Sequence, residues 1–361
     1  MATTLITQTA RFYLTSGIPQ DLRWATDQQA IWVQIYAGPW SPETVMMIKT
    51  QLVPVEGFVT LYEIRELLER YMLSFKESRL FPVHVQHSEN GTNWTEAATW
   101  TVVYCEKNIN LQGMSPSVWL ERNFLSTLTA KVLPTNDDVM EQLFFVQPAN
   151  APATPLLHVT YIDDEDVVQA TDITLQANYP ASDANLYCVQ FSVAAVKAAV
   201  AAAVDVIAVT LSVGNRHMEY YRPSRRENVG FVFRNAFNVM ESAYLSAVIT
   251  RKTEDGRKLA NVSGTLAHYD RKPVTEYEVQ TSPLSFEEAS WIDQLITSPE
   301  VTLLDGTPLI ITDGNAECHN DNSELNAAKF SYKELDQRHT IIAAAPVANI
   351  FTVPPHSYQF K

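Results

Sequence analysis

Glycine is scarce in this sequence, with 11 residues among 361. That share is about 3%, under half of the ~7% that is usual in soluble proteins. The scarcity argues against collagen-like repeats, glycine-rich linkers and phosphate-binding loops, and neither a Walker motif nor a dinucleotide-binding fingerprint occurs. Cysteine is scarce too. Cys105, Cys188 and Cys318 are widely spaced and odd in number, which predicts inert thiols in a reducing compartment and no disulfide framework.

Positive charge is in deficit as well. The chain has 26 Lys and Arg against 41 Asp and Glu, a net charge of −15 at pH 7. A nucleic-acid binder needs a basic face, so we expect no nucleic acid as a partner. No run reaches the ~18 apolar residues of a membrane span, so we expect no membrane partner. The N-terminus MATTLITQTARFYL lacks the basic and apolar regions of a secretory signal, which predicts folding in the cytoplasm.

Signatures of catalysis and of metal binding are also missing. There is no G-x-S-x-G elbow and no cysteine in a catalytic setting. His84 and His87 would point to opposite faces of a strand, whereas two ligands on one strand stand two residues apart. Segment 313–322 matches no EF-hand register and is typical of a solvated loop, and the acidic run 163–166 is typical of a charged turn; a structural cation site, with calcium at 313–322, is the alternative interpretation. We therefore predict a non-enzyme with no catalytic residue, cofactor or metal.

Short runs of alternating apolar and polar residues fill most of the chain and predict strands. The Asn90-Gly91 step predicts a hairpin between strands near 83–87 and 99–105. A second hairpin is expected around Asp305-Gly306, with strands at Val301–Leu304 and Leu309–Thr312. Strands at intervals of roughly 8 to 12 residues favour sandwich-like domains over a βαβ fold.

Two capping boxes predict the main helices. Thr60-Leu61-Tyr62-Glu63 precedes an apolar stripe and predicts an amphipathic helix at about 61–75. Ser285-Phe286-Glu287-Glu288 predicts a second helix at about 286–297, which Ser298-Pro299 ends. The alanine-rich segment 194–204 favours a short third helix, directly before a strand.

The predicted fold class is mainly β with a few helices (α+β), arranged as two β-sandwich-like domains that each carry one capped amphipathic helix. Three prolines between Gln147 and Pro155 predict a stiff connector. We therefore expect an N-terminal β-rich domain at 1–134, a Pro-rich linker at 135–155 and a C-terminal β-rich domain at 156–361.

One basic cluster, Arg222-Pro223-Ser224-Arg225-Arg226, stands out against the acidic composition. Because arginine forms bidentate pairs with acidic groups, Arg222, Arg225 and Arg226 are candidates for a contact with another subunit. A solvated loop is the alternative interpretation. The seven tryptophans could stack on sugars, although tryptophan at strand spacing is typical of a protein core.

Three segments carry a resemblance to a known class of proteins. In the first, residues 55–68, a Gly turn leads into the first predicted helix. In the second, residues 230–241, a strand ends at Asn235, and an aromatic residue, a turn and the acidic Glu241 follow. The third is the helix at 286–297 with the hairpin that follows it. In the second segment Ala236 stands where such proteins carry glycine. The order of these features resembles virion structural proteins of the tail, baseplate or neck in Bacteroidetes phages and prophages.

The resemblance implies a non-enzymatic phage virion structural protein, a tail, baseplate or neck subunit that assembles through repeated subunit contacts. Its expected partners are other virion proteins and copies of itself, and its expected location is the virion, after synthesis in the host cytoplasm. The alternative is a carbohydrate- or cell-surface-binding β-sandwich module, such as a fibre or adhesin, with a glycan as its partner.

Overall fold

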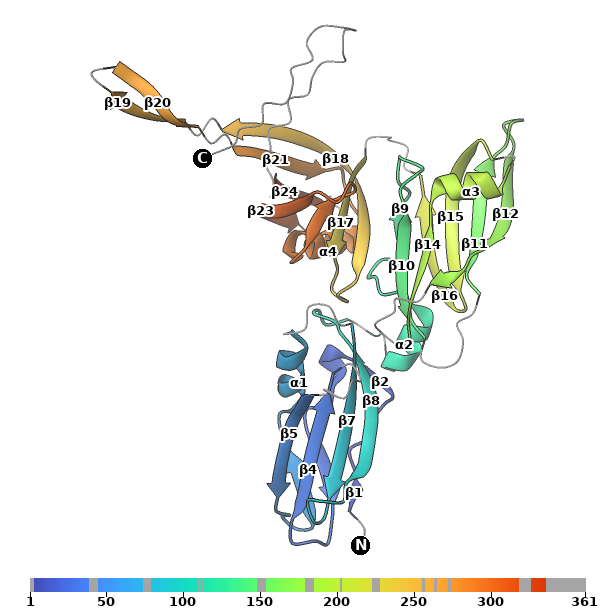
Figure 1. Cartoon of the computed structure of the whole chain (residues 1–361). Helices are drawn as coiled ribbons and strands as arrows, with labels where there is room; N and C mark the ends of the chain where they lie inside the picture. The colour runs from blue at the N-terminus through green and yellow to red at the C-terminus, as the bar shows by residue number, and fades with distance from the viewer. Residues whose placement is uncertain are drawn as a thin grey trace, which may run out of the picture.

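The computed structural model is built mainly from strands, which confirms the predicted mainly-β class. It describes residues 3–38, 45–73, 79–109, 111, 113–147, 154–178, 185–201, 203–222, 228–254, 257–262, 265–271, 274–317 and 326–335. Within these residues the chain forms three lobes, each with a hydrophobic core of its own (Figure 1). We name them the N-terminal lobe (3–109), the middle lobe (113–222) and the barrel lobe (228–335).

The N-terminal lobe packs a five-stranded sheet, in the order β2-β8-β7-β4-β5, against a three-stranded sheet, β1-β3-β6, and one helix. The predicted Asn90-Gly91 hairpin is confirmed by the antiparallel pair β7 and β8. The elements are β1 Thr4–Leu5, β2 Phe12–Leu14, η1 Thr15–Gly17, β3 Leu22–Ala25, β4 Ile31–Ala37, β5 Val45–Leu52, β6 Phe58–Leu61, α1 Ile64–Leu73, β7 Leu80–Ser88 and β8 Thr95–Val103.

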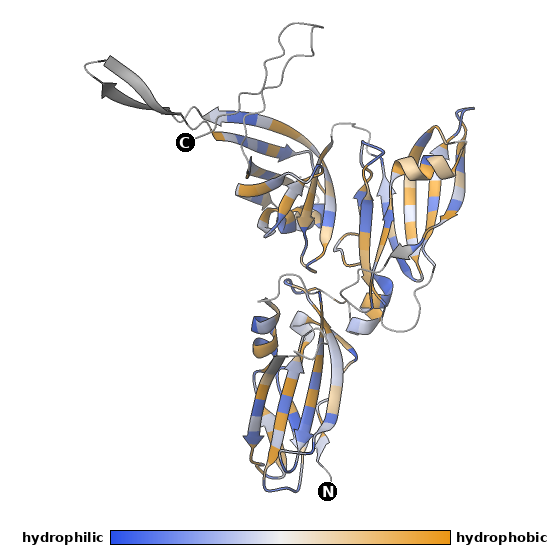
Figure 2. Cartoon of the chain, in the orientation of Figure 1, coloured by the Kyte–Doolittle hydropathy of each residue, from blue (hydrophilic) through white to orange (hydrophobic). Residues whose placement is uncertain are grey.

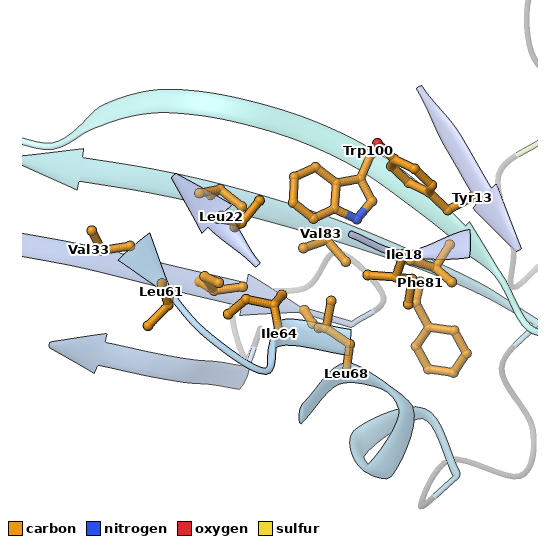
Figure 3. Close-up of a cluster of buried hydrophobic side chains, with 14 of the residues drawn as sticks. Tyr13, Ile18, Leu22, Val33, Leu61, Ile64, Leu68, Phe81, Val83 and Trp100 are labelled. Carbon is orange, nitrogen blue, oxygen red and sulfur yellow. The ribbon is translucent and has the colours of Figure 1, made fainter. Parts of the chain in front are cut away.

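Strand alternation places the core of this lobe between its two sheets. Val83 and Val85 on β7 are buried, whereas their neighbours His84 and Gln86 are partly exposed. Figure 2 shows the same alternation of apolar and polar bands along the strands. Figure 3 shows how Ile64 and Leu68 of α1 face the sheet residues Val83 and Trp100.

The first helix begins later than its predicted capping box. Thr60 belongs to β6, which pairs with β3 as far as Leu61, so the helix cannot start directly after Thr60. The chain instead turns at Glu63, which has a positive φ of 61°, and the Ile64 N–H donates to the Gln20 carbonyl oxygen (2.8 Å). The prediction of a Thr60 cap was therefore wrong because strand pairing extends to Leu61, while the apolar stripe of the helix was predicted correctly.

The middle lobe packs a five-stranded sheet, β12-β11-β15-β16-β9, against a three-stranded sheet, β10-β14-β13, and the helix α3. The predicted short helix in 194–204 is confirmed by α3, which Ser192 caps through its side chain. The elements are α2 Pro116–Arg122, β9 Ala130–Val132, β10 Glu141–Val146, β11 Leu156–Ile162, β12 Val168–Thr174, β13 Ala177–Asn178, β14 Leu186–Phe191, α3 Val193–Ala199, β15 Asp205–Val213 and β16 Arg216–Tyr221.

The predicted linker at 135–155 is corrected by β10. This strand lies inside the segment and pairs with β14 along its whole length, from Glu141 with Phe191 to Val146 with Leu186. Phe145 is completely buried, so the segment contributes to the core of the middle lobe. Of the three prolines that suggested a linker, Pro155 directly precedes β11, and Pro148 and Pro152 lie outside the described residues.

The barrel lobe closes six strands, β17-β18-β21-β24-β23-β22, into a barrel against which α4 packs. The predicted domain at 156–361 thus contains two separate cores. The elements are β17 Asn228–Arg234, β18 Met240–Glu254, β19 Arg257–Val262, β20 Thr265–Arg271, β21 Val274–Thr281, α4 Phe286–Thr297, β22 Val301–Leu303, β23 Pro308–Glu317 and β24 Ala327–Glu334.

Both local predictions in the barrel lobe are confirmed. The Ser285 hydroxyl accepts from the Glu288 N–H (3.2 Å) and the Glu288 carboxylate accepts from the Ser285 N–H (2.8 Å), which forms the expected capping box. The hairpin around Asp305-Gly306 joins β22 and β23. The predicted loop at 313–322 is corrected, because residues 313–317 continue β23 and pair with β24; residues 318–322 lie outside the described residues.

A two-stranded hairpin extends from the barrel. Strands β18 and β21 pair as far as Glu254 and Val274, and β19 and β20 follow between them as a sheet of their own. Figure 1 shows this hairpin projecting away from the rest of the molecule. We call residues 257–271 the arm.

Candidate functional site

The three lobes meet at a fourth buried cluster, which we call the junction cluster. Each lobe contributes side chains to it, and the turn between β17 and β18 supplies the members from the barrel lobe. Its buried residues are Phe12, Leu14, Leu80, Val103, Cys105, Trp119, Leu120, Leu125, Val146, Leu186, Phe237 and Val239.

The turn contacts the middle lobe through the side chain of Phe237. Its ring is completely buried and stacks on Trp119 in the middle of α2, with 5.7 Å between the ring centroids. The backbone of the turn also binds the N-terminal lobe, because the Glu106 N–H donates to the Ala236 carbonyl oxygen (2.8 Å) and the Arg79 Nε donates to that of Asn238 (3.2 Å). One turn thus contacts both of the other lobes.

A buried polar network holds this turn in shape. Asn235 accepts from the Phe237 N–H (2.9 Å) and donates to the Leu125 carbonyl oxygen (2.8 Å). It also donates to Glu241 Oε2 (2.7 Å), whose other oxygen accepts from the Ser126 hydroxyl (2.6 Å). Because buried polar groups are costly unless they are hydrogen-bonded, this network specifies one arrangement of the middle and barrel lobes.

Charged groups extend the network into the space between β9, β10 and β18. The Lys131 ammonium lies 3.2 Å from Glu241 Oε1, and both side chains are almost completely buried. Burial raises the pKa of the neighbouring Glu141 carboxyl, against the opposing effects of the Lys131 charge and the Tyr244 hydroxyl. Burial also raises the pKa of Tyr220 well above its ordinary value. Burial thus disfavours the charged form of Glu141, while Lys131 and Glu241 form a buried ion pair.

Arg216 supports the same junction from β16. Its buried guanidinium donates to the carbonyl oxygens of Leu120 (2.5 Å) and Val146 (2.7 Å) and to the Gln147 side chain (3.2 Å). Burial lowers its pKa to about 10. These bonds satisfy carbonyl groups at the ends of α2 and β10, so this arginine joins two segments of the middle lobe.

A pocket of about 190 Å³ lies between the outer face of β18, β9 and α4. At its rim the Tyr221 hydroxyl donates to Glu288 Oε1 (3.2 Å), which links β16 to α4. Its wall includes Lys131, Tyr244 and Trp291. Small-molecule sites usually measure ~300–1,000 Å³, so this space fits a few waters better than a substrate. The geometry favours a structural seam between lobes over a catalytic cleft.

The described residues show no arrangement typical of a metal site or a membrane span. No group of three or more His, Cys, Asp or Glu side chains among them is placed to hold a metal ion. None of the helices in these ranges is both long and apolar enough to cross a membrane. Burial raises the pKa of Cys105 to about 12 and that of Cys188 to about 11, which disfavours the reactive thiolate; Cys318 lies outside the described residues.

The predicted subunit-contact residues are described only in part. Arg222 follows β16, and its guanidinium binds Asp137 Oδ1 (2.6 Å) and the Val206 carbonyl oxygen (2.7 Å) and lies 3.4 Å from Asp205. These partners belong to the same chain. Arg225 and Arg226 lie outside the described residues, and the role of this loop in a subunit contact stays a prediction.

Most of the described tryptophans are core residues. Trp24, Trp100, Trp119 and Trp291 are buried, as their spacing along strands and helices predicted. The two that remain partly exposed lie close to the 88–94 turn: Trp32 packs beneath Gly91, and the Trp94 ring has the Lys49 ammonium 5.2 Å from its centroid. Trp40 lies outside the described residues. Glycan stacking stays a prediction, and fluorescence quenching by glycans would test it.

Comparison with known proteins adds no family to these observations. A scan against protein-family models and a search of curated proteins find no match to the chain.

Sequence reasoning found part of the junction. It singled out residues 230–241, which contain Asn235, Phe237 and Glu241, but it had no signal for Arg216 or Lys131. Each of these two is a single basic residue in an ordinary strand. The Ser115-Pro116 step, typical of a helix start, could have located α2, where Ser115 caps the first turn.

Proposed function

We propose that this protein is a non-enzymatic structural subunit of a virion, in a tail, baseplate or neck assembly, and that it associates with copies of itself and with other virion proteins. The observation that carries the proposal is the arm. A two-stranded hairpin is at best marginally stable in water without a further strand or a packing surface. The only sheet partner of β19 in the described part of the chain is β20. We infer that the arm gains its missing contacts from another subunit.

The charge of the arm supports this reading. Residues 257–271 contain three basic and one acidic residue, in a chain whose net charge is −15. A basic projection on an acidic body is attracted to the body of a second copy.

The junction supports the proposal in a second way. A subunit that makes repeated contacts in an assembly needs its lobes in one fixed arrangement. The turn at 235–239 joins all three lobes through packed rings and buried hydrogen bonds. We further propose that the N-terminal and middle lobes are β-sandwich modules, because each has two sheets across one core.

The test compares the intact protein with a variant that lacks the arm. Residues 255–273 are replaced by Asn-Gly, a two-residue turn suited to joining the opposed residues Glu254 and Val274. We expect light scattering and negative-stain images of the intact protein to reveal rings, tubes or a defined oligomer, and the armless variant to have the monomer mass of about 39 kDa.

Two outcomes would overturn the proposal. One is an intact protein that stays monomeric at high concentration, and the other is an armless variant that assembles as the intact protein does. The urea midpoint of the armless variant serves as the folding control, because a deletion confined to a projecting hairpin should leave the three cores unchanged.

A further inference from the structure

We propose that the arm of one copy docks beside β12 of a second copy and extends the middle-lobe sheet of that copy. The inference rests on the proposed function, and it names the surface that receives the arm. The strand β12 is an edge of its five-stranded sheet and pairs only with β11 in the described part of the chain.

Apart from the charged side chain of Asp172, which lies 2.7 Å from His158 of β11, this edge lacks the devices that normally prevent strand addition. Natural sheets protect their edges with lysine, proline, bulges or very short strands. Strand β12 is seven residues long, pairs with β11 without a register shift and contains neither lysine nor proline. In contrast, β5, the comparable edge of the N-terminal lobe, carries Lys49 and a bulge at Met47.

The hydrogen-bond pattern shows which groups of β12 point outward. The Asp163 N–H donates to the Val167 carbonyl oxygen, and the Leu175 N–H donates to that of Pro155. Because hydrogen-bonded pairs alternate along an antiparallel ladder, the N–H groups of residues 169, 171 and 173 point towards β11. Those of 168, 170, 172 and 174 therefore point away from the sheet, in position to bind a further strand.

The charge of this edge is complementary to that of the arm. Residues 163–172 contain five acidic and no basic residues, whereas the arm has a net charge of +2. At the acidic end, the side chains of Val167 and Val168 are 46% and 61% exposed. With six and seven residues, β19 and β20 match the length of β12.

The partner must be a second copy and not the same chain. Figure 1 shows the arm on one side of the barrel lobe and β12 on the far side of the middle lobe, so the two lie far apart within one molecule. A contact between two different surfaces is head-to-tail, and such contacts build rings or filaments.

The experiment blocks the edge and the arm separately. Ala170→Pro removes an outward N–H of β12 without breaking a bond to β11, and Ala170→Val at the same exposed position retains that N–H and serves as the matched control. Val168→Lys adds an edge charge and provides a second blocking variant that removes no backbone group. Circular dichroism and the urea midpoint verify that each variant folds.

The decisive step is to mix two variants. The Ala170→Pro protein has an arm but a blocked edge, and the armless protein has an open edge but no arm. We expect each alone to be monomeric, their mixture to form a dimer of about 80 kDa that grows no further, and the Ala170→Val control to assemble like the intact protein.

The outcomes separate the two proposals. If Ala170→Pro and Val168→Lys assemble like the intact protein while the armless variant does not, the receiving surface is not β12, and the proposed function stands. Two monomeric variants that fail to form a dimer when mixed would also overturn the inference. If the intact protein itself is monomeric, the proposed self-assembly fails first, and the inference fails with it.

Discussion

Replacing Phe237 by alanine tests whether the β17–β18 turn holds the three lobes together. The ring is completely buried and stacks on Trp119, in a cluster to which all three lobes contribute. Truncation of a buried phenylalanine costs about 3–5 kcal/mol, through lost burial and the cavity that remains. We expect the upper part of this range, because the cavity is bounded by three lobes whose positions are also fixed by the bonds from Asn235.

The assay is urea unfolding followed by tryptophan fluorescence, to which Trp119, in contact with the substituted ring, contributes together with the other six tryptophans. The matched control is Phe286→Ala, the same substitution at the first residue of α4, where the side chain is 50% exposed. The control should change the free energy of unfolding by no more than about 0.5 kcal/mol.

A loss below about 1 kcal/mol for Phe237→Ala would refute the reasoning, because it would mean that the cluster collapses around the missing ring at little cost. A loss in Phe286→Ala as large as that in Phe237→Ala would also refute it, since exposure would then not distinguish the two positions.

Two further substitutions test the buried acid and the barrel. The pKa of Glu141 in the folded protein is raised above its ordinary value of 4.5. The protonated Glu141 side chain therefore contributes its full stabilisation below pH 4.5, and this stabilisation is lost as the pH rises through the folded-state pKa. Glu141→Gln should therefore gain stability relative to the natural protein as the pH rises above 4.5 in urea titrations, and a difference that does not vary with pH would contradict this. Gly314→Ala should cost about 1–3 kcal/mol by thermal or urea unfolding, because a Cβ there would lie 2.5 Å from Ile296 Cγ2 and 3.3 Å from Phe330 Cβ. Gly17→Ala, whose Cβ would meet nothing nearer than 4.0 Å, is the control, and equal losses at both positions would count against the packing argument.

The elements that the sequence predicted best are those with local causes. Helix α4 has its capping box, its apolar stripe and its terminating Ser298-Pro299 within a short segment, and it was predicted at its observed bounds. The Asn90-Gly91 and Asp305-Gly306 turns likewise predicted their hairpins. In each case the signal and the structure that it specifies lie within a few residues of each other.

The elements that were missed depend on distant partners. Thr60 fits a capping box, yet β6 pairs with β3, and this pairing overrides the local signal. Strand β10 lies next to a proline-rich stretch, and only its pairing with β14 identifies it as a strand. A local signal gives way when long-range pairing competes for the same backbone groups.

The junction shows the same limit for the candidate site. Asn235, Phe237 and Glu241 lie in one segment that sequence reasoning singled out, but their partners do not. Ser126 precedes Glu241 by 115 residues, and Leu125 precedes Asn235 by 110. No spacing rule connects such positions, so the polar network follows only from the fold.

Charge alone also does not identify an assembly surface. Arg222 belongs to the most conspicuous basic cluster in the sequence, yet its guanidinium binds Asp137 and lies near Asp205 within its own chain. The arm is less conspicuous as a sequence, with its three basic residues spread over 257–271, but its strands pair only with each other among the described residues. A contact by strand addition needs backbone groups without partners, and within the described part of the chain no further strand pairs with the edges of the arm or with the outer edge of β12. For this reason we propose the arm and β12 as the assembly contact, although the basic cluster at 222–226 is the stronger signal in the sequence.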